Sequence, residues 1–169
     1  MRDRYRILAL DVRGHGESAW SPTAAYRYAD QASDLAALVD RLELDKFVLI
    51  GTSMGGIIAM AYAAEHGERL LGLVINDIGP DAEARTQRIT QTVGTRPDDF
   101  ATLEDAMAYR RAISPITAAR PLEDQRELAL GVLRQRADGR WVWKMDPAFT
   151  GLPHAVQVSV SPITTKPAG

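Results

Sequence analysis

A serine in a glycine-rich segment is the residue of this sequence best placed for nucleophilic chemistry. Ser53 lies at the centre of G-T-S-M-G-G, residues 51–56, after the apolar run K-F-V-L-I and before a helical stretch. This setting of the G-x-S-x-G pattern predicts a sharp strand-to-helix turn, in which small residues on both sides let the two elements pass closely. Such a turn holds its serine at a helix N-terminus, where the helix dipole favours the negative charge that develops in acyl transfer.

The amide of Met54 is the candidate oxyanion donor, because this residue follows the serine and begins the helix. The alternative for Ser53 is an ordinary serine in a strand-to-helix turn, since the G-x-S-x-G pattern also occurs by chance. The strand before it, the helix after it and a second motif favour the nucleophile.

The second motif is D-V-R-G-H-G-E-S, at residues 11–18. Together with G-T-S-M-G-G it resembles the serine-nucleophile branch of the α/β-hydrolase superfamily, whose esterase- and lactonase-like members carry a helical lid. In that family D-x-R-G-x-G-x-S follows the fourth strand and the nucleophile turn follows the fifth. The resemblance covers residues 5–80, and the W-V-W-K-M-D-P segment at residues 141–147 resembles the family's return from the lid to the sheet.

The resemblance also implies a histidine base late in the chain and an acid after the sixth or seventh strand. Asp77 follows the strand that corresponds to the sixth and is the candidate acid, the alternative being a turn or cap residue in N-D-I-G-P. His154 is the candidate base. His15 is expected to shape its loop, and His66 suits the last turn of a helix.

The elements around these motifs predict an α/β fold. Apolar runs at residues 6–11, 46–51 and 70–77 show no alternation, which predicts strands covered by helices on both faces. Residues 29–42 and 54–66 predict two helices between them, the second ending at a left-handed Gly67. This order predicts a parallel sheet with right-handed crossovers, and the resemblance implies a partial doubly wound parallel sheet of the α/β-hydrolase fold, followed by a helical lid.

Three polar helical stretches, at residues 82–93, 103–112 and 122–137, indicate an insertion before a hairpin turn at Asp138–Gly139. The resemblance implies that this insertion is the family's lid. Trp141 and Trp143 are expected either to line an acyl pocket under the lid or to anchor the lid to the sheet. Arg110 and Arg111 are expected on a solvated face. We therefore divide the chain into a partial hydrolase core at 1–80, a lid at 81–140, and a return segment with an irregular tail at 141–169.

The composition is that of an ordinary globular protein, with 169 residues, 46% apolar and 25% charged residues and a net charge of −2. Lys and Arg are scattered among Asp and Glu, which argues against nucleic acid or a membrane surface as partner. The chain has no cysteine and no metal-ligand or nucleotide-binding pattern, so we expect neither metal nor cofactor. Its first apolar run is too short for a signal peptide or a membrane span, which predicts a cytoplasmic protein. Nothing in the sequence predicts the oligomeric state.

The resemblance implies hydrolysis of a small carboxylic ester, thioester or lactone through a serine nucleophile and an acyl-enzyme. The family's first three strands and its H-G oxyanion loop would precede residue 1, so we expect a chain truncated at both ends. Because the family's third strand lies between its fourth and fifth, we also expect a gap in the sheet. The alternative is therefore a catalytically inactive fragment that lacks the triad histidine and the oxyanion loop, or a chain that assembles with another chain supplying the missing strands.

Overall fold

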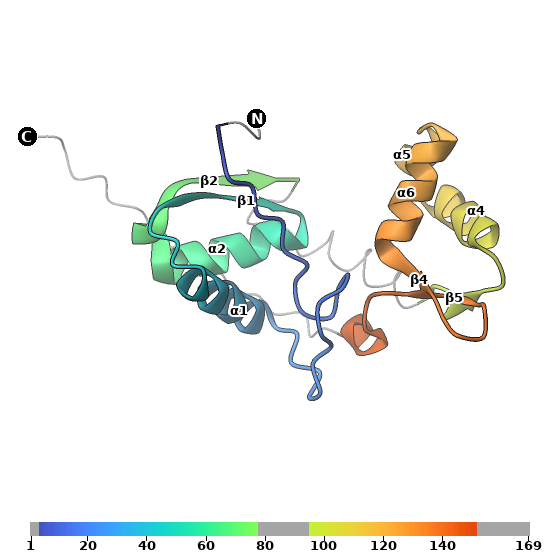
Figure 1. The fold of residues 1–169 in the computed structure, drawn as a ribbon, viewed down its shortest axis with the longest axis horizontal. Coiled ribbons are helices and arrows are strands. Elements are labelled where there is room, and N and C mark those ends of the chain that lie inside the picture. Colours follow the sequence, from blue (N-terminus) through green and yellow to red (C-terminus); the bar gives the residue numbers. More distant parts are fainter. Residues whose placement is uncertain (1–3, 78–94, 152–169) are drawn as a thin grey trace, which may run out of the picture.

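The computed structural model describes residues 4–77, called the core below, and residues 95–151, called the lid segment below because most of them fall in the predicted lid; the two lie side by side (Figure 1). The core contains α1 (Tyr28–Arg41), β1 (Phe47–Thr52), α2 (Met54–His66) and β2 (Leu70–Asn76). Strands β1 and β2 pair in parallel, and Thr52 at the end of β1 faces Asn76 at the end of β2. The predicted parallel α/β arrangement is therefore confirmed for these elements.

One face of this two-stranded sheet is covered by α1 and α2. Val39 of α1 and Ile58 and Tyr62 of α2 are buried in one cluster, against which Leu49 of β1 and Leu70 of β2 pack. The spacing of apolar residues on α1 gives it one apolar stripe, which faces this cluster, whereas α2 is apolar on nearly all sides, as is typical of a helix with little exposed surface.

The other face of the sheet is open in the described part of the chain. Val48 and Ile50 of β1 are 53% and 67% exposed, and Leu71 of β2 is 70% exposed. Among residues 4–77 and 95–151, helices therefore cover one face of this sheet, and a helix on the other face stays a prediction. Exposed apolar side chains at alternate positions are typical of a sheet face that further polypeptide covers.

The apolar run at residues 6–11 was predicted as a strand and forms none. It pairs with no strand among the described residues, and Ile7 and Leu8 are 62% and 49% exposed. A strand exists only through hydrogen bonds to a neighbour. Among the described residues β1 pairs only with β2, so the gap expected between residues 6–11 and β1 stays a prediction.

The end of α2 differs from the prediction at Gly67. This residue has φ −58° and ψ −27°, so it is right-handed rather than left-handed. It begins a 3-10 turn, Gly67–Arg69, in which the Leu70 amide donates to the Gly67 carbonyl. The tighter turn satisfies the end of the helix without a left-handed cap.

The lid segment contains helices α4 (Leu103–Ile113), α5 (Pro115–Ala118) and α6 (Leu122–Val132), and short strands β3 (Asp99–Phe100), β4 (Leu133–Gln135) and β5 (Trp141–Trp143). The strands form an antiparallel sheet in the order β3-β5-β4. The helix predicted at 103–112 is confirmed, whereas the one predicted at 122–137 ends at Val132. The stretch predicted at 82–93 lies outside the described residues.

The hairpin predicted at Asp138–Gly139 is confirmed between β4 and β5. Gly139 has φ 84°, and the Arg136 amide donates to the Arg140 carbonyl at 2.8 Å. Helix α4 begins with a reciprocal cap, because the Thr102 side chain accepts from the Asp105 amide at 3.1 Å and the Asp105 carboxylate accepts from the Thr102 amide.

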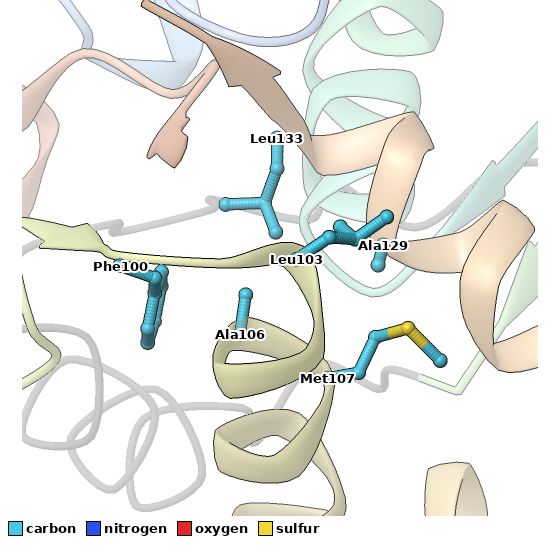
Figure 2. Packing of buried hydrophobic residues seen from close by; sticks show 6 residues of the cluster. All are labelled: Phe100, Leu103, Ala106, Met107, Ala129 and Leu133. Atoms are coloured by element: carbon cyan, nitrogen blue, oxygen red, sulfur yellow. The ribbon is translucent and has the colours of Figure 1, made fainter. Parts of the chain in front are cut away.

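Apolar residues from α4, α6 and the small sheet form the lid's own core (Figure 2). Its buried members are Phe100, Leu103, Ala106, Met107, Ala129 and Leu133. Trp143 packs against this cluster, with its ring centroid 5.6 Å from that of Phe100, and its indole N–H donates to the Pro97 carbonyl at 2.8 Å. Trp143 therefore ties the small sheet to the rest of the lid.

In the described part of the chain, no helix is both long and apolar enough to cross a bilayer.

Candidate active site

The backbone at Ser53 has the strained geometry expected of a nucleophile turn. Ser53 lies at φ 52° and ψ −121°, between the last residue of β1 and the first of α2. Residues other than glycine rarely occupy this region, and holding one there costs on the order of 1–3 kcal/mol. The side chain is half-exposed and has no hydrogen-bond partner among the described residues.

The glycine two places before the serine is required by space. A Cβ added at Gly51 would lie 2.3 Å from the Gly55 carbonyl oxygen and 2.8 Å from the Gly56 Cα. A Cβ added at Gly55 would meet nothing within 4 Å. The close approach predicted from the motif is therefore real, and Gly51 is the residue that allows it.

Ser53 and Asp77 lie at the same end of the sheet. The Ser53 amide donates to the Asn76 carbonyl at 2.9 Å, so the chain leaving β1 stays tied to the last residue of β2. Asp77 follows directly, with φ 58° and an exposed side chain. The two candidates thus meet at the carboxyl edge of adjacent parallel strands, where active sites of open α/β sheets form.

Met54 occupies the position predicted for an oxyanion donor. It is the first residue of α2, so its amide has no carbonyl in a preceding helical turn to bind. The next contacts of the turn run from the Gly56 and Ile57 amides to the Ser53 carbonyl, at 2.8 Å and 3.3 Å. The Met54 amide therefore stays available beside the serine.

No histidine of the described chain contacts Ser53. His154, the candidate base, lies outside the described residues. His15 is half-buried, its Nδ1 lies 3.3 Å from the Arg13 carbonyl, and its ring meets the Phe149 ring edge-on at 4.5 Å. Burial lowers the pKa of His15, and the positive charge of Arg96 lowers it further. A ring packed in this way fits the predicted role of shaping the loop.

The loop at residues 11–18 is held by its own residues. The Asp11 carboxylate accepts from the Glu17 amide at 3.0 Å, and the Ser18 hydroxyl donates to the Asp11 carbonyl at 2.6 Å. Gly16 has φ 53°, and an added Cβ would lie 2.0 Å from the Asp11 carboxylate. The motif therefore encodes a compact loop, which explains its glycines and its acid.

The sequence did not indicate that the return segment docks on this loop. The Tyr26 hydroxyl donates to the Asp146 carboxylate, although the two residues are 120 positions apart, and the Asp146 amide donates to the Gly14 carbonyl at 2.9 Å. Both side chains are buried, Tyr26 at 1% and Asp146 at 7% exposure. The only feature of the sequence that indicated this return to the core was the W-V-W-K-M-D-P segment, which does not indicate the residues that it contacts.

The described residues offer no alternative metal-dependent site. Among residues 4–77 and 95–151, no group of three or more His, Cys, Asp or Glu side chains is arranged to hold a metal ion.

The lid arginine Arg110, expected on a solvated face, is half-buried, and its Nε is buried without a hydrogen-bond partner in the described chain.

Comparison with known proteins shows that the chain is similar to hydrolases. A family model described as the alpha/beta hydrolase fold matches residues 1–139. The chain is 36% identical over 148 residues to a 3-hydroxybutyrate-oligomer hydrolase of Cupriavidus necator. The aligned region covers 85% of this chain and 50% of that relative. It is 28% identical over 165 residues to an esterase of Mycobacterium tuberculosis, covering 93% of this chain and 55% of the esterase.

A solved structure agrees with the sequence relatives. An alpha/beta hydrolase from Novosphingobium aromaticivorans superposes with a TM-score of 0.74 at 27% identity, over 90% of this chain and 54% of that one. The chain spans about half the length of the curated relatives it matches.

Proposed function

Because the chain belongs to the alpha/beta hydrolase fold family, we propose that it hydrolyses a small carboxylic ester, thioester or lactone with Ser53 as the nucleophile. The two relatives named above are an esterase and an oligomer hydrolase, and they support hydrolysis as the class of reaction. Serine at the nucleophile position supports an acyl-enzyme in particular, because a serine oxygen attacks a carbonyl carbon.

The strained turn at Ser53 is the observation that carries this proposal. Its φ of 52° and ψ of −121° cost stability, and its hydroxyl has no partner among the described residues that would make the conformation structurally useful. Strain of this kind is typical of active sites, where the surrounding structure holds it for chemistry. Gly51, which makes the turn possible, supports the same interpretation.

Each proposed residue has one role in the reaction. The Ser53 oxygen attacks the carbonyl carbon while its proton passes to the base, for which we propose His154, oriented by Asp77. The Met54 amide stabilises the oxyanion of the tetrahedral intermediate. The proton then leaves with the alcohol or thiol, and a water molecule hydrolyses the acyl-enzyme to release the acid and regenerate Ser53.

We also propose the division of the chain on which this reaction depends. Residues 1–80 form the partial hydrolase core, residues 81–140 the lid, and residues 141–169 the return segment and tail. Two separate clusters of buried residues, one in the core and one in the lid, support the first boundary. The contact of Asp146 with Tyr26 supports a return of the chain to the core after the lid.

A fluorophosphonate probe tests the nucleophile, because it reacts with a serine only when a base activates that serine. We expect the purified, folded chain to be labelled and the Ser53→Ala variant to lose the labelling. Ser33→Ala is the matched control, since Ser33 is an exposed serine on α1, and it should label at the wild-type rate. Loss of the base in His154→Ala should lower the labelling rate by several orders of magnitude.

The same assay contradicts the proposal if the probe does not label a folded protein. Circular dichroism establishes whether the chain is folded before labelling. A folded chain that is not labelled would favour the alternative function, a catalytically inactive hydrolase fragment without an assembled triad.

A further inference from the structure

The core and the lid segment each bury apolar residues in a cluster of their own. Val39, Ile58 and Tyr62 belong to the cluster of the core, and Leu103 and Ala129 belong to that of the lid segment (Figure 2). Units that each have their own hydrophobic core can move relative to one another, unless a large apolar interface holds them together. The contacts that fix the position of the lid segment on the core are therefore distinct from those that fold each unit.

One set of contacts between the two units has a buried centre and lies on the loop that carries the D-V-R-G-H-G-E-S motif. The Asp146 amide donates to the Gly14 carbonyl at 2.9 Å, and the Tyr26 hydroxyl donates to the Asp146 carboxylate. The centroid of the Phe149 ring lies 4.5 Å from that of His15 and 5.2 Å from that of Tyr26. Tyr26 and Asp146 are buried, and the low local dielectric strengthens the hydrogen bond between them. These five residues form the buried contact.

Glycine at position 14 makes room for the buried contact. Gly14 has φ 75°, and a Cβ added there would lie 2.6 Å from Cε1 and 3.0 Å from Cζ of the Tyr26 ring. Tyr26 is 1% exposed, so its ring has no free space into which it could move. A larger residue at this position would therefore displace Tyr26 from Asp146. This glycine of the motif thus serves the attachment of the lid segment to the core.

A second set of contacts between the two units lies at the surface. The Lys144 ammonium group pairs with the Glu17 carboxylate at 2.5 Å, and the Trp20 indole N–H donates to the Lys144 carbonyl at 3.1 Å. The Arg134 guanidinium group lies over the Trp20 ring, 5.5 Å from its centroid. The side chain of Lys144 is 16% exposed, whereas that of Glu17 is 76% exposed. These four residues form the surface contact.

The two contacts differ in the movements that they oppose. A buried contact at one place leaves a neighbouring unit free to rotate about it, as at a hinge, whereas a second contact beside it opposes the rotation. The surface contact is the weaker of the two, because water and salt weaken exposed hydrogen bonds and ion pairs. It still favours one position, since the mostly buried Lys144 ammonium group would lose its partner Glu17 on rotation.

We propose that the lid segment rotates on the core as one body, with the buried contact as the hinge and the surface contact as a latch that holds the position seen in Figure 1. The motif loop then has a second role, because it contributes to both contacts. Gly14 and His15 belong to the hinge, and Glu17 belongs to the latch. The inference does not depend on the proposed function, because it concerns the positions of two folded units and no reaction.

Pulsed electron spin resonance measures the position of the lid segment as the distance between two spin labels. The chain has no cysteine, so labels can be attached to cysteines introduced at chosen positions. Ser33→Cys on α1 and Glu123→Cys on α6 place one label on each unit, both at exposed positions. We expect the doubly labelled chain without further changes to show one main distance.

Two changes remove the latch and leave the hinge intact. Glu17→Gln removes the ion pair with Lys144, and Trp20→Phe removes the indole N–H while it keeps a ring beneath Arg134. In the chain with both changes, a second distance should appear in at least about a tenth of the molecules, because the lost contacts together shift an equilibrium roughly tenfold. Glu65→Gln is the matched control, since Glu65 is an exposed glutamate on α2, and it should keep the original distance distribution.

The methyl NMR signals of Ile58 and Met107 show whether each unit stays folded, because these residues lie in the two clusters. Both signals should keep their wild-type shifts when the latch is removed. An unchanged distance distribution in a folded chain without the latch would overturn the inference. A second distance that appears together with a shifted Met107 signal would also overturn it, because the lid segment would then unfold rather than rotate.

Discussion

Replacing Gly51 by alanine tests whether the nucleophile turn depends on the close approach of two backbone segments. The added Cβ would lie 2.3 Å from the Gly55 carbonyl oxygen, 2.6 Å from the Gly55 carbonyl carbon and 2.8 Å from the Gly56 Cα. All three are backbone atoms of α2, so no flexible side chain can move aside. The strand and the helix must separate, or the turn must change its conformation.

The expected cost follows from two opposing effects. Overpacking of this kind costs about 1–3 kcal/mol, and the backbone clash at Gly51 places it near the upper end. Alanine regains about 0.5–1 kcal/mol because it loses less conformational entropy than glycine. The net destabilisation is about 2 kcal/mol, which lowers Tm by about 4–8 °C in a chain of this size.

Thermal and urea unfolding followed by circular dichroism measure this effect, with Gly55→Ala as the matched control. Gly55 lies in the same motif, but its added Cβ meets nothing within 4 Å, and alanine is the better helix former. Gly55→Ala should therefore unfold at or slightly above the wild-type Tm. The reasoning is refuted if Gly51→Ala unfolds within about 1 °C of the wild type, or if both variants lose the same stability.

Two further predictions concern the loop on which the return segment docks. Tyr26→Phe removes the hydroxyl that donates to the buried Asp146 carboxylate, so we expect urea unfolding to show a loss of about 1–3 kcal/mol; an unchanged midpoint would contradict the contact. Burial lowers the pKa of His15 below its ordinary value of 6.5, so the unfolded chain binds the proton first as the pH falls. The free energy of unfolding should therefore decrease as the pH falls from 6.5 to the pKa of His15 in the folded protein. This dependence on pH should be absent in His15→Gln. A His15 imidazole whose NMR shifts titrate above pH 6.5 in the folded protein would contradict the prediction.

The structural features that the sequence predicted correctly are those that depend on residues close together in the chain. The turn at Ser53, helix α2 and the parallel pairing of β1 with β2 all follow from residue types and spacing within about thirty positions. The hairpin at Asp138–Gly139 is similar, because a left-handed glycine fixes the turn locally. These features needed no knowledge of distant neighbours.

Predictions failed where distant contacts decide the outcome. Residues 6–11 have the composition of a strand, but a strand needs a partner, and none of the described residues supplies one. Helix α6 ends five residues early because Leu133 enters the lid core and pairs with Trp143 of β5. The contact between Tyr26 and Asp146 spans 120 positions, so no local pattern could reveal it.

The strain at Ser53 yields a test that separates structure from function at one position. Glycine accepts φ 52° and ψ −121° without steric cost, so Ser53→Gly should relieve about 1–3 kcal/mol of strain while losing about 0.5–1 kcal/mol in chain entropy. Ser53→Ala removes the hydroxyl but keeps the Cβ, and therefore keeps the strain. Both variants should lose fluorophosphonate labelling, yet only Ser53→Gly should unfold at higher urea than the wild type. If Ser53→Gly is less stable than Ser53→Ala by about 0.5–1 kcal/mol, which is the entropy loss alone, the turn is not strained, and the main structural argument for a nucleophile at this position fails.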